Sequence, residues 1–255
     1  MLSIKSDEYQ QATPFPHIYI DNFLDNNRAH MIQKEILEIK VDEWDRYQNP
    51  FEEKYTLRDK FNFPFHLKKL FEELESDTFI ESLSNMCGYQ LIKDTTRNFW
   101  GVHTYQNGDK LDIHVDAGIH PITGLKKQIT LGIYLSKNWM ESYGCKLELW
   151  KGDNAGISTP RLYKKIKEIS PIFNRLVIFT CNDYSWHGNP EKVCSPDDAK
   201  RIFITISYMS NNTDDLNKRK KAMFISRPLD LEDPEKDRLR FLRADPERYK
   251  EIYRI

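Results

Sequence analysis

Six short runs rich in β-branched and aromatic residues constrain the fold of this chain more than any other feature. They are separated by turn-forming pairs such as Asn107-Gly108 and Asn182-Asp183, and they occupy residues 99–105, 111–115, 128–135, 146–150, 176–180 and 201–209. Several alternate, as where Ile202, Ile204 and Ile206 are interleaved with Phe203, Thr205 and Ser207. Alternation places every second side chain on one face of a strand. The pattern predicts a β-rich core from about residue 89 to 210.

Helical patterns precede this core. Asp25 or Asn26 can cap a helix whose apolar residues recur at helical spacing, and a second amphipathic helix is predicted from about Leu67 to Met86, with Gly88 at its end. Residues 14–24 carry two prolines before a short apolar run, which predicts an edge strand. Residues 41–64 are aromatic, polar and irregular, and we expect them to run over the surface. Helices followed by many antiparallel strands favour an α+β fold, mainly β, built as a helix-supported sandwich or barrel.

The last forty residues differ in composition. After residue 213 the chain becomes highly charged, with prolines at 228, 234 and 246 expected to break the helices. Its arginines alternate with acids at Arg238, Arg240, Arg243, Arg248 and Arg254. Such a run is typical of a solvated helix face, and the alternatives are a lid or a homodimer contact. We therefore predict a domain over residues 1–213 and a charged helical extension over residues 214–255.

Composition limits the partners and the compartment. The 255 residues carry a formal net charge of −1, which argues against a general electrostatic grip on nucleic acid or on an anionic membrane. No apolar run approaches the roughly 20 residues of a membrane span. The four cysteines are scattered without a Cys-x-x-Cys pair, and the first residues lack the apolar segment of a secretory signal. These features predict a cytoplasmic protein with reduced thiols.

The motif that carries chemistry is His114-Val115-Asp116, followed about seventy residues later by His187. An imidazole and a carboxylate two positions apart lie on the same face of a strand, so one short segment can present two ligands to one metal ion. A second imidazole from a distant strand would complete a two-histidine, one-carboxylate face, which suits Fe(II) with open positions for other ligands. Alone, His-x-Asp is also a common chance pattern.

The order of further motifs around these residues resembles the Fe(II)/2-oxoglutarate-dependent dioxygenases, in particular the prolyl 4-hydroxylase-like branch. The matching pieces span about 110 residues in order, and residues 16–24 also resemble the entry to that fold. The pieces are residues 105–116, 130–135, 144–150, 174–179, 186–188 and 201–205. The resemblance implies a double-stranded β-helix, a jelly-roll of the cupin-like kind, supported by N-terminal helices.

The resemblance also implies roles for individual residues. His114, Asp116 and His187 would bind Fe(II) and form the catalytic centre, and Arg201 would pair with the distal carboxylate of 2-oxoglutarate, since a guanidinium offers two parallel donors. Lys200 competes for that role. Among further candidates, Tyr105 and Thr130 would either add hydrogen bonds to the cosubstrate or lie in the core with their hydroxyls hydrogen-bonded within the protein. Trp186 would either line the iron site or pack in the core. His103, two positions before Tyr105, is expected either to face the same cavity or to lie in the core, and His120 is a candidate for a substrate contact.

Two departures from the family pattern affect the site's surroundings. Gly144-Cys145 stands where the family often has two glycines, so the turn there is expected to differ. Thirteen residues separate His187 from Arg201, slightly more than is usual, and a longer loop would reshape the cavity mouth.

The resemblance implies an enzyme that uses Fe(II), 2-oxoglutarate and O2 to hydroxylate an unactivated C–H bond, releasing succinate and CO2. The substrate would be a small molecule, an amino acid or a peptide with a prolyl-like residue, selected by residues 41–64 and 118–127. Two alternatives stay open. One is a cupin-like metalloenzyme that does not use 2-oxoglutarate, and the other is a non-catalytic binding protein on the same fold.

Overall fold

The computed structural model describes residues 6–57, 62–212, 219–245 and 247–248. Its helices are α1 Ser6–Gln10, α2 Asn26–Glu38, α3 Phe65–Leu74, α4 Asp77–Cys87 and α5 Pro234–Ala244, with 3-10 turns at Val41–Glu43 and Glu141–Tyr143. Its strands are β1 His17–Ile20, β2 Trp44–Asn49, β3 Glu52–Leu57, β4 Ile92–Lys93, β5 Gly101–Tyr105, β6 Lys110–Val115, β7 Lys126–Tyr134, β8 Leu147–Gly152, β9 Leu162–Ile169, β10 Arg175–Thr180, β11 Trp186–Asn189, β12 Arg201–Ser210 and β13 Met223–Phe224.

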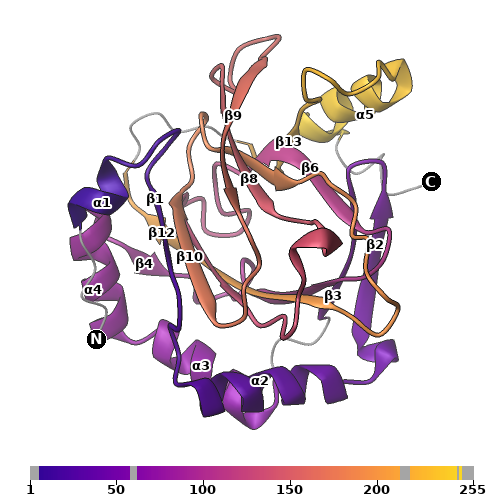
Figure 1. Cartoon of the computed structure of the whole chain (residues 1–255). Coiled ribbons are helices and arrows are strands. Elements are labelled where there is room, and N and C mark those ends of the chain that lie inside the picture. The colour runs from indigo at the N-terminus through magenta and orange to yellow at the C-terminus, as the bar shows by residue number, and fades with distance from the viewer. Residues whose placement is uncertain (1–5, 58–61, 213–218, 246, 249–255) are drawn as a thin grey trace.

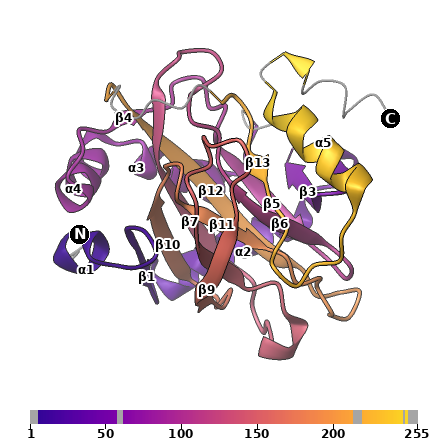
Figure 2. The same ribbon diagram turned by 90° about the horizontal axis from the view of Figure 1, so that it is seen from above.

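The strands pair into one curled sheet whose order is β1-β10-β7-β12-β5-β3-β6-β11-β8-β9. Three short strands join from the side, with β2 on β3, β4 on β12 and β13 on β6. Every pairing between the described strands is antiparallel. Figures 1 and 2 show α1 and α4 on one side of the curled sheet and α5, in yellow, on the other. The predicted strands of the core are confirmed, and β1 is an edge strand as expected.

The main hydrophobic core lies between the sheet and the helices α2, α3 and α4. Ile129, Leu131 and Ile133 of β7 and the three isoleucines of β12 are buried in it, against helix residues such as Leu67 and Leu70. Burying each such side chain contributes roughly 1.5–3 kcal/mol. Because the alternate residues of β7 and β12 face the other way, the same packing turns Thr130, Tyr134, Phe203 and Thr205 into the interior of the curl, where they line a cavity.

The helices begin and end where local capping allows. The Asp25 side chain accepts a hydrogen bond from the Arg28 amide at 3.0 Å and starts α2, as predicted. The single helix predicted over residues 67–86 is wrong, because the structure has two. Ser76 caps a new helix by accepting from the Phe79 amide, and its hydroxyl donates to the Glu73 carbonyl, which ends the first. Gly88 ends α4 with a left-handed φ of 74°.

The prediction of an irregular surface run over residues 41–64 is also wrong. The structure forms the hairpin β2–β3 there, and β3 continues into the sheet by pairing with both β5 and β6. Both faces of β3 carry polar side chains, so the apolar alternation that reveals a strand in the sequence is missing. Glu52 is nevertheless buried, because its face of the strand is turned toward the cavity.

The C-terminal extension is only partly a solvated helix. The chain first forms β13 against β6, and α5 then begins at Pro234, with the Asp233 side chain accepting from the Lys236 amide. Proline fits the first helical position, so Pro234 starts the helix that it was expected to break. Arg238 is exposed as predicted, but Arg240 and Arg243 are buried, because α5 packs against β13. Arg254 lies outside the described residues, as do residues 213–218, so the division at residue 213 stays a prediction.

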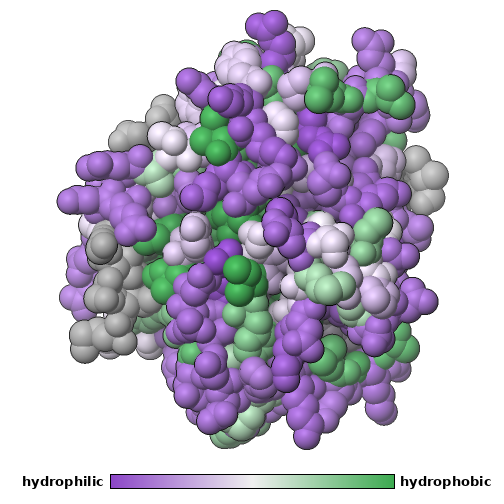
Figure 3. Space-filling model, in the orientation of Figure 1, coloured by the Kyte–Doolittle hydropathy of each residue, from purple (hydrophilic) through white to green (hydrophobic). Residues whose placement is uncertain are grey.

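The surface is predominantly hydrophilic, as the purple residues in Figure 3 show, with separate hydrophobic patches between them. Among the described residues, no helix combines the length and the apolar character that crossing a membrane requires.

Candidate active site

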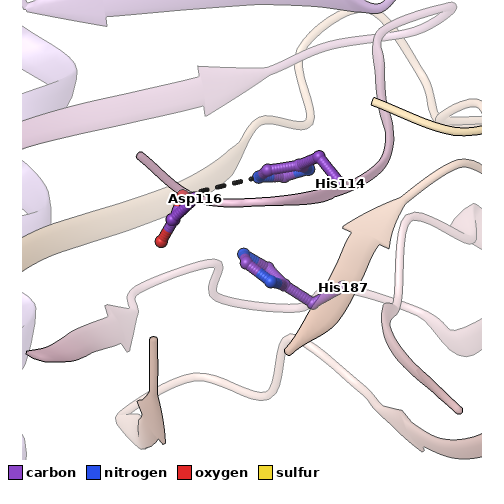
Figure 4. Close-up of side chains that lie close together, drawn as sticks. All are labelled: His114, Asp116 and His187. Carbon is purple, nitrogen blue, oxygen red and sulfur yellow. Dashed lines mark ion pairs between the residues drawn. The ribbon is translucent and has the colours of Figure 1, made fainter. Parts of the chain in front are cut away.

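Three side chains from two neighbouring strands converge at one point (Figure 4). His114 lies on β6, Asp116 follows the end of that strand, and His187 on β11 is the direct register partner of His114. One ligand atom from each residue lies within 4.8 Å of the others, and His114 Nε2 is 3.7 Å from Asp116 Oδ1. The antiparallel pairing of β6 with β11 thus brings together residues that are about seventy positions apart.

Backbone carbonyls orient both imidazoles. The Nδ1 of His114 is 2.9 Å from the carbonyl of Asp112, and that of His187 is 2.8 Å from the carbonyl of Ser185. Because a carbonyl can only accept, each Nδ1 carries the proton and donates it, and each Nε2 keeps its lone pair for the convergence point. Burial, reinforced by the nearby His114, lowers the pKa of His187 to about 4, so that imidazole is neutral at pH 7.

The carboxylate is held through one oxygen only. Lys127 donates to Asp116 Oδ2 at 2.8 Å and the Thr130 hydroxyl donates to the same oxygen at 3.2 Å, which leaves Oδ1 facing His114. Burial alone would raise the pKa of Asp116, but the positive charge of Lys127 and the contact with His114 hold it well below its usual range. Asp116 is therefore ionised at neutral pH.

The donor set fits a divalent metal of the first transition row. Two Nε2 lone pairs and one carboxylate oxygen meet on one side, and their partners fix their orientation as outer-shell partners do in metal sites. Two histidines and one carboxylate leaving open positions are the facial set associated with non-haem Fe(II).

Arg201 stands in the same cavity, which has a volume of about 320 Å³. The residue is 1% exposed, and its guanidinium lies against the rings of Tyr105, Tyr134 and Phe203 at 4.7, 5.0 and 5.5 Å from the ring centres. Its Nη2 reaches the Tyr134 hydroxyl at 3.4 Å, whereas Nε and Nη1 are buried and have no hydrogen-bond partner among the described residues. A buried cation with unused donors favours an anionic ligand, such as a carboxylate.

The other predicted residues fall into two groups. Tyr105 and Thr130 line the cavity, as does His103, which lies 2.9 Å from the Thr56 hydroxyl. Three residues lie away from its described lining. Lys200 is exposed outside it, Trp186 is fully buried and donates to the Asp153 carbonyl, and His120 is buried within hydrogen-bonding distance of Thr96.

Two residues near the predicted site were missed from the sequence. Tyr134 contacts Arg201, and its place on the same face of β7 as Thr130 could have revealed it. Lys127 could not be found by alternation, since it is an odd number of positions from Thr130. In the pairing of β7 with β12 the register skips Gln128, because Tyr208 faces Ile129 and Met209 faces Lys127. This irregularity turns Lys127 into the cavity.

The unusual turn before β8 is also present. Gly144 has a φ of 69°, and Cys145, where the family often has a second glycine, has a φ of 54° and is fully buried. Left-handed φ is uncommon for a residue with a side chain, so the packing around Cys145 holds it there.

Comparisons with known proteins agree with this geometry. Residues 100–209 match the model of the 2OG-Fe(II) oxygenase superfamily. Among solved structures, a prolyl-4-hydroxylase from Pseudomonas putida is 12% identical, with a TM-score of 0.58 over 80% of this chain and 98% of that chain. A prolyl 4-hydroxylase from Phytophthora capsici is 19% identical, with a TM-score of 0.55 over 97% of this chain and 79% of that one. No curated protein sequence matches this chain.

A prolyl hydroxylase from Trichoplax adhaerens, solved with a peptide fragment of a hypoxia inducible factor, is 20% identical, with a TM-score of 0.58 over 80% of this chain and 89% of that chain. At these identities the likeness shows the fold, which is the predicted double-stranded β-helix. The matched region and the triad give residues 100–209 the core of an Fe(II)/2-oxoglutarate-dependent oxygenase, an enzyme that uses Fe(II), 2-oxoglutarate and O2. The predicted resemblance to the prolyl 4-hydroxylase-like branch is confirmed at the level of the fold.

Proposed function

We propose that this enzyme hydroxylates an unactivated C–H bond of a small molecule, an amino acid or a peptide with a prolyl-like residue, with release of succinate and CO2. The observation that carries the proposal is that one cavity contains both the convergent triad and a buried guanidinium with two unused nitrogen donors. A metalloenzyme that did not use an anionic cosubstrate would have no use for that cation.

In this proposal His114, Asp116 and His187 hold Fe(II) through the two Nε2 atoms and Oδ1. When bound, Fe(II) with 2-oxoglutarate and O2 supplies the oxidation, in which the cosubstrate becomes succinate and CO2. The carbonyls of Asp112 and Ser185 keep both imidazoles in the tautomer that leaves Nε2 open. Lys127 and Thr130 occupy the second oxygen of Asp116, so that carboxylate presents one oxygen to the metal.

Arg201 binds the distal carboxylate of 2-oxoglutarate with its guanidinium, on which Nε and Nη1 are unused. Tyr105 and Tyr134 pack their rings against the guanidinium and exclude water from it, which strengthens its attraction for a carboxylate. Exclusion of water also protects a reactive site from side reactions. The Thr130 hydroxyl donates to Asp116 and so helps to orient this metal ligand. Tyr105 supports binding of the cosubstrate.

The test is an anaerobic titration of the metal-free protein with Fe(II) and 2-oxoglutarate, following the weak visible charge-transfer band of the chelate. We expect the wild type to form the band and Arg201→Ala to lose it at the same cosubstrate concentration. Lys200→Ala is the matched control, since it removes a neighbouring cation that is exposed. Fe(II) binding, measured separately as bound metal, should persist in both variants.

Two results would contradict the proposal. Iron binding by the wild type without the band would mean that 2-oxoglutarate is not the cosubstrate, which favours the cupin-like alternative. An unchanged band in Arg201→Ala would remove the assigned role of the guanidinium. If the band forms as expected, release of succinate gives the assay with which amino acids, peptides and other small molecules are compared as substrates.

A further inference from the structure

Two loops beside the triad are joined by buried polar side chains. One loop, residues 94–100, precedes β5, and the other, residues 116–125, connects β6 to β7. Asp94 on the first loop and His120 on the second are both buried, and His120 Nε2 lies 3.1 Å from Asp94 Oδ1. Buried polar groups are stable when they are hydrogen-bonded, so their partners show what these two residues hold in place.

The direction of the hydrogen bonds around His120 follows from the chemistry of its partners. The Nδ1 of His120 lies 3.2 Å and 3.1 Å from the amides of Ile122 and Thr123. Because an amide N–H can only donate, Nδ1 accepts, and the ring proton is on Nε2. The Thr96 hydroxyl donates to Asp94 Oδ1 at 2.7 Å, so its oxygen is left to accept from His120 Nε2, which is 3.0 Å away.

Asp94 orders the first loop in the same way. Its Oδ1 also accepts from the Thr96 amide at 3.0 Å, and its Oδ2 accepts from the Phe99 amide at 2.8 Å. We call the three side chains of Asp94, Thr96 and His120 the loop network. Through it, the backbone of Phe99, which lines the cavity, is tied to the second loop.

Phe99 connects the loop network to the triad. Its ring lies at 82° to the ring of His120, with centres 5.1 Å apart, and Lys127 Nζ lies above its face, 4.9 Å from the centre. The same ammonium donates to Asp116 Oδ2 at 2.8 Å, whereas Oδ1 of that carboxylate faces His114 (Figure 4). An aromatic face attracts a cation, and exclusion of water strengthens an ion pair. Phe99 therefore favours the position of the ammonium in which it engages one oxygen of Asp116.

We propose that the loop network positions the metal ligand Asp116, acting through Phe99 and Lys127. It keeps Oδ2 engaged, so that the carboxylate presents Oδ1 to the metal in a fixed orientation. The inference rests on the proposed function, in which Asp116 is a metal ligand. His120, a candidate for a substrate contact in the sequence, acts instead on the metal site.

The loop network also fastens the oxygenase core to the segment before it. Asp94, Thr96 and Phe99 precede residues 100–209, where the superfamily match falls, whereas His120 and Lys127 lie within it. The orientation of a ligand in the matched region thus depends on side chains that the preceding segment supplies.

The experiment measures the affinity of the metal-free protein for Mn(II) alone, with the EPR spectrum of the bound ion as a second readout. Phe99→Leu removes the aromatic face but keeps an apolar side chain, and Thr96→Val removes the hydroxyl that joins His120 to Asp94. We expect each variant to bind Mn(II) about threefold to tenfold more weakly, somewhat less than removal of a direct partner of a ligand produces. The EPR lines should broaden, because Asp116 is less ordered.

Conservative variants and a matched control accompany these two. Phe99→Tyr keeps the ring and Thr96→Ser keeps the hydroxyl, so both should retain most of the wild-type affinity and the wild-type spectrum. Thr95→Val is the same substitution as Thr96→Val at the neighbouring, exposed threonine, and it should change Mn(II) affinity by less than about twofold.

A double-mutant cycle tests whether Phe99 acts through Lys127. In a Lys127→Met background there is no ammonium for the ring to hold, so Phe99→Leu should then change Mn(II) affinity by less than about twofold. The free energy of unfolding is measured for every variant. A merely structural role of Phe99 would lower stability in both backgrounds and would produce no such dependence on Lys127.

The inference is overturned if Phe99→Leu or Thr96→Val binds Mn(II) as the wild type does, if Thr96→Ser is as impaired as Thr96→Val, or if the effect of Phe99→Leu is the same with and without Lys127. Failure of the proposed function looks different. In that case the Mn(II)-loaded wild type would not bind 2-oxoglutarate, while the dependence of Mn(II) affinity on Phe99 and Lys127 would still be measured.

Discussion

The two carboxylate oxygens of Asp116 make different contacts, so removing this side chain has two effects. Oδ2 neutralises Lys127 and Oδ1 faces His114. Asp116→Ala removes one of three metal ligands and leaves the buried ammonium of Lys127 without its carboxylate. We expect Fe(II) affinity to fall by more than about 100-fold, beyond what loss of a supporting contact produces, and succinate formation to fall to background.

The measurement is bound iron after desalting, with succinate as the second readout. Glu141→Ala, which removes an exposed carboxylate on the surface, is the control and should keep both. Retained iron and turnover in Asp116→Ala would rule out Asp116 as a ligand.

Gly132 makes room for the ring beside Arg201. A Cβ at this position would lie 1.9 Å from Phe203 Cζ, so Gly132→Ala must displace the ring, which packs 5.5 Å from the guanidinium. Overpacking of this kind costs about 1–3 kcal/mol, and the displaced ring should also weaken 2-oxoglutarate binding. Gly101→Ala is the control, because a Cβ there meets only ordinary contacts at 3.6 Å or more.

The two readouts for Gly132→Ala are the free energy of unfolding in denaturant and the affinity for 2-oxoglutarate. Adding Phe203→Leu should restore part of both, since a smaller side chain vacates the space. If Gly132→Ala binds 2-oxoglutarate as well as Gly101→Ala does, the ring does not position Arg201.

Single-residue predictions from the sequence succeeded where position follows from local rules. Two ligands at spacing two share a strand face, and Arg201 rather than Lys200 points inward because successive strand residues alternate. Lys127 was not predicted, because its side chain points into the cavity only as a result of a register shift between β7 and β12. No pattern within residues 126–134 reveals that shift.

At the scale of elements, the strands that bury one apolar face were predictable, whereas those with polar faces were not. β7 and β12 are recognisable in the sequence, because isoleucine and leucine recur at every second position. β3, β9 and β11 carry charged, aromatic or ligand residues in their place. β13 has two residues, and its formation depends on its pairing with β6. A sequence pattern reveals a strand when the strand buries an apolar face. Strands that turn polar side chains toward the cavity lack that pattern.

β13 is also a support for the metal site. The ring of Phe224 stacks on Phe51 at 4.9 Å between centres and lies 5.0 Å from the ring of His114. Phe224→Ala should therefore cost about 3–5 kcal/mol in unfolding free energy and lower the affinity for Fe(II), because His114 loses one of its neighbours.

Phe241→Ala on α5 is the matched control, since that ring is 59% exposed and its loss should change stability by less than about 0.5 kcal/mol. Denaturant unfolding and iron titration test both variants. Equal stability of the two variants would mean that the C-terminal segment is not part of the folded unit around the site.

At the scale of the whole molecule, Glu52 joins parts of the chain that are 191 residues apart, through its bond with Arg243. Burial alone would raise the pKa of Glu52, but the charges of Lys54 and Arg243 outweigh it and lower the pKa to about 2, from an ordinary value of 4.5. The unfolded chain therefore takes up this proton more readily than the folded protein. Glu52 contributes its full stabilisation above about pH 4.5 and loses it as the pH falls toward 2.

The shift corresponds to roughly 3 kcal/mol at neutral pH. Glu52→Gln removes the titrating group and leaves Lys54 and Arg243 facing an amide, so we expect it to be about 3–5 kcal/mol less stable than the wild type at pH 7. That difference should narrow steadily below pH 4.5, because only the wild type has this stabilisation to lose. The other carboxylates titrate in both proteins and cancel in the comparison.

The measurement is the free energy of unfolding in urea from pH 7 to pH 3 for the wild type, Glu52→Gln and Glu53→Gln, the last being the same substitution on the opposite face of β3. A difference between wild type and Glu52→Gln that stays constant over this range would show that folding does not lower the pKa of Glu52. The ion pairs of Glu52 with Lys54 and Arg243 would then not stabilise the folded protein, and the closure of the chain around the cavity would depend on other contacts, such as the apolar contacts of Phe51 and Phe224.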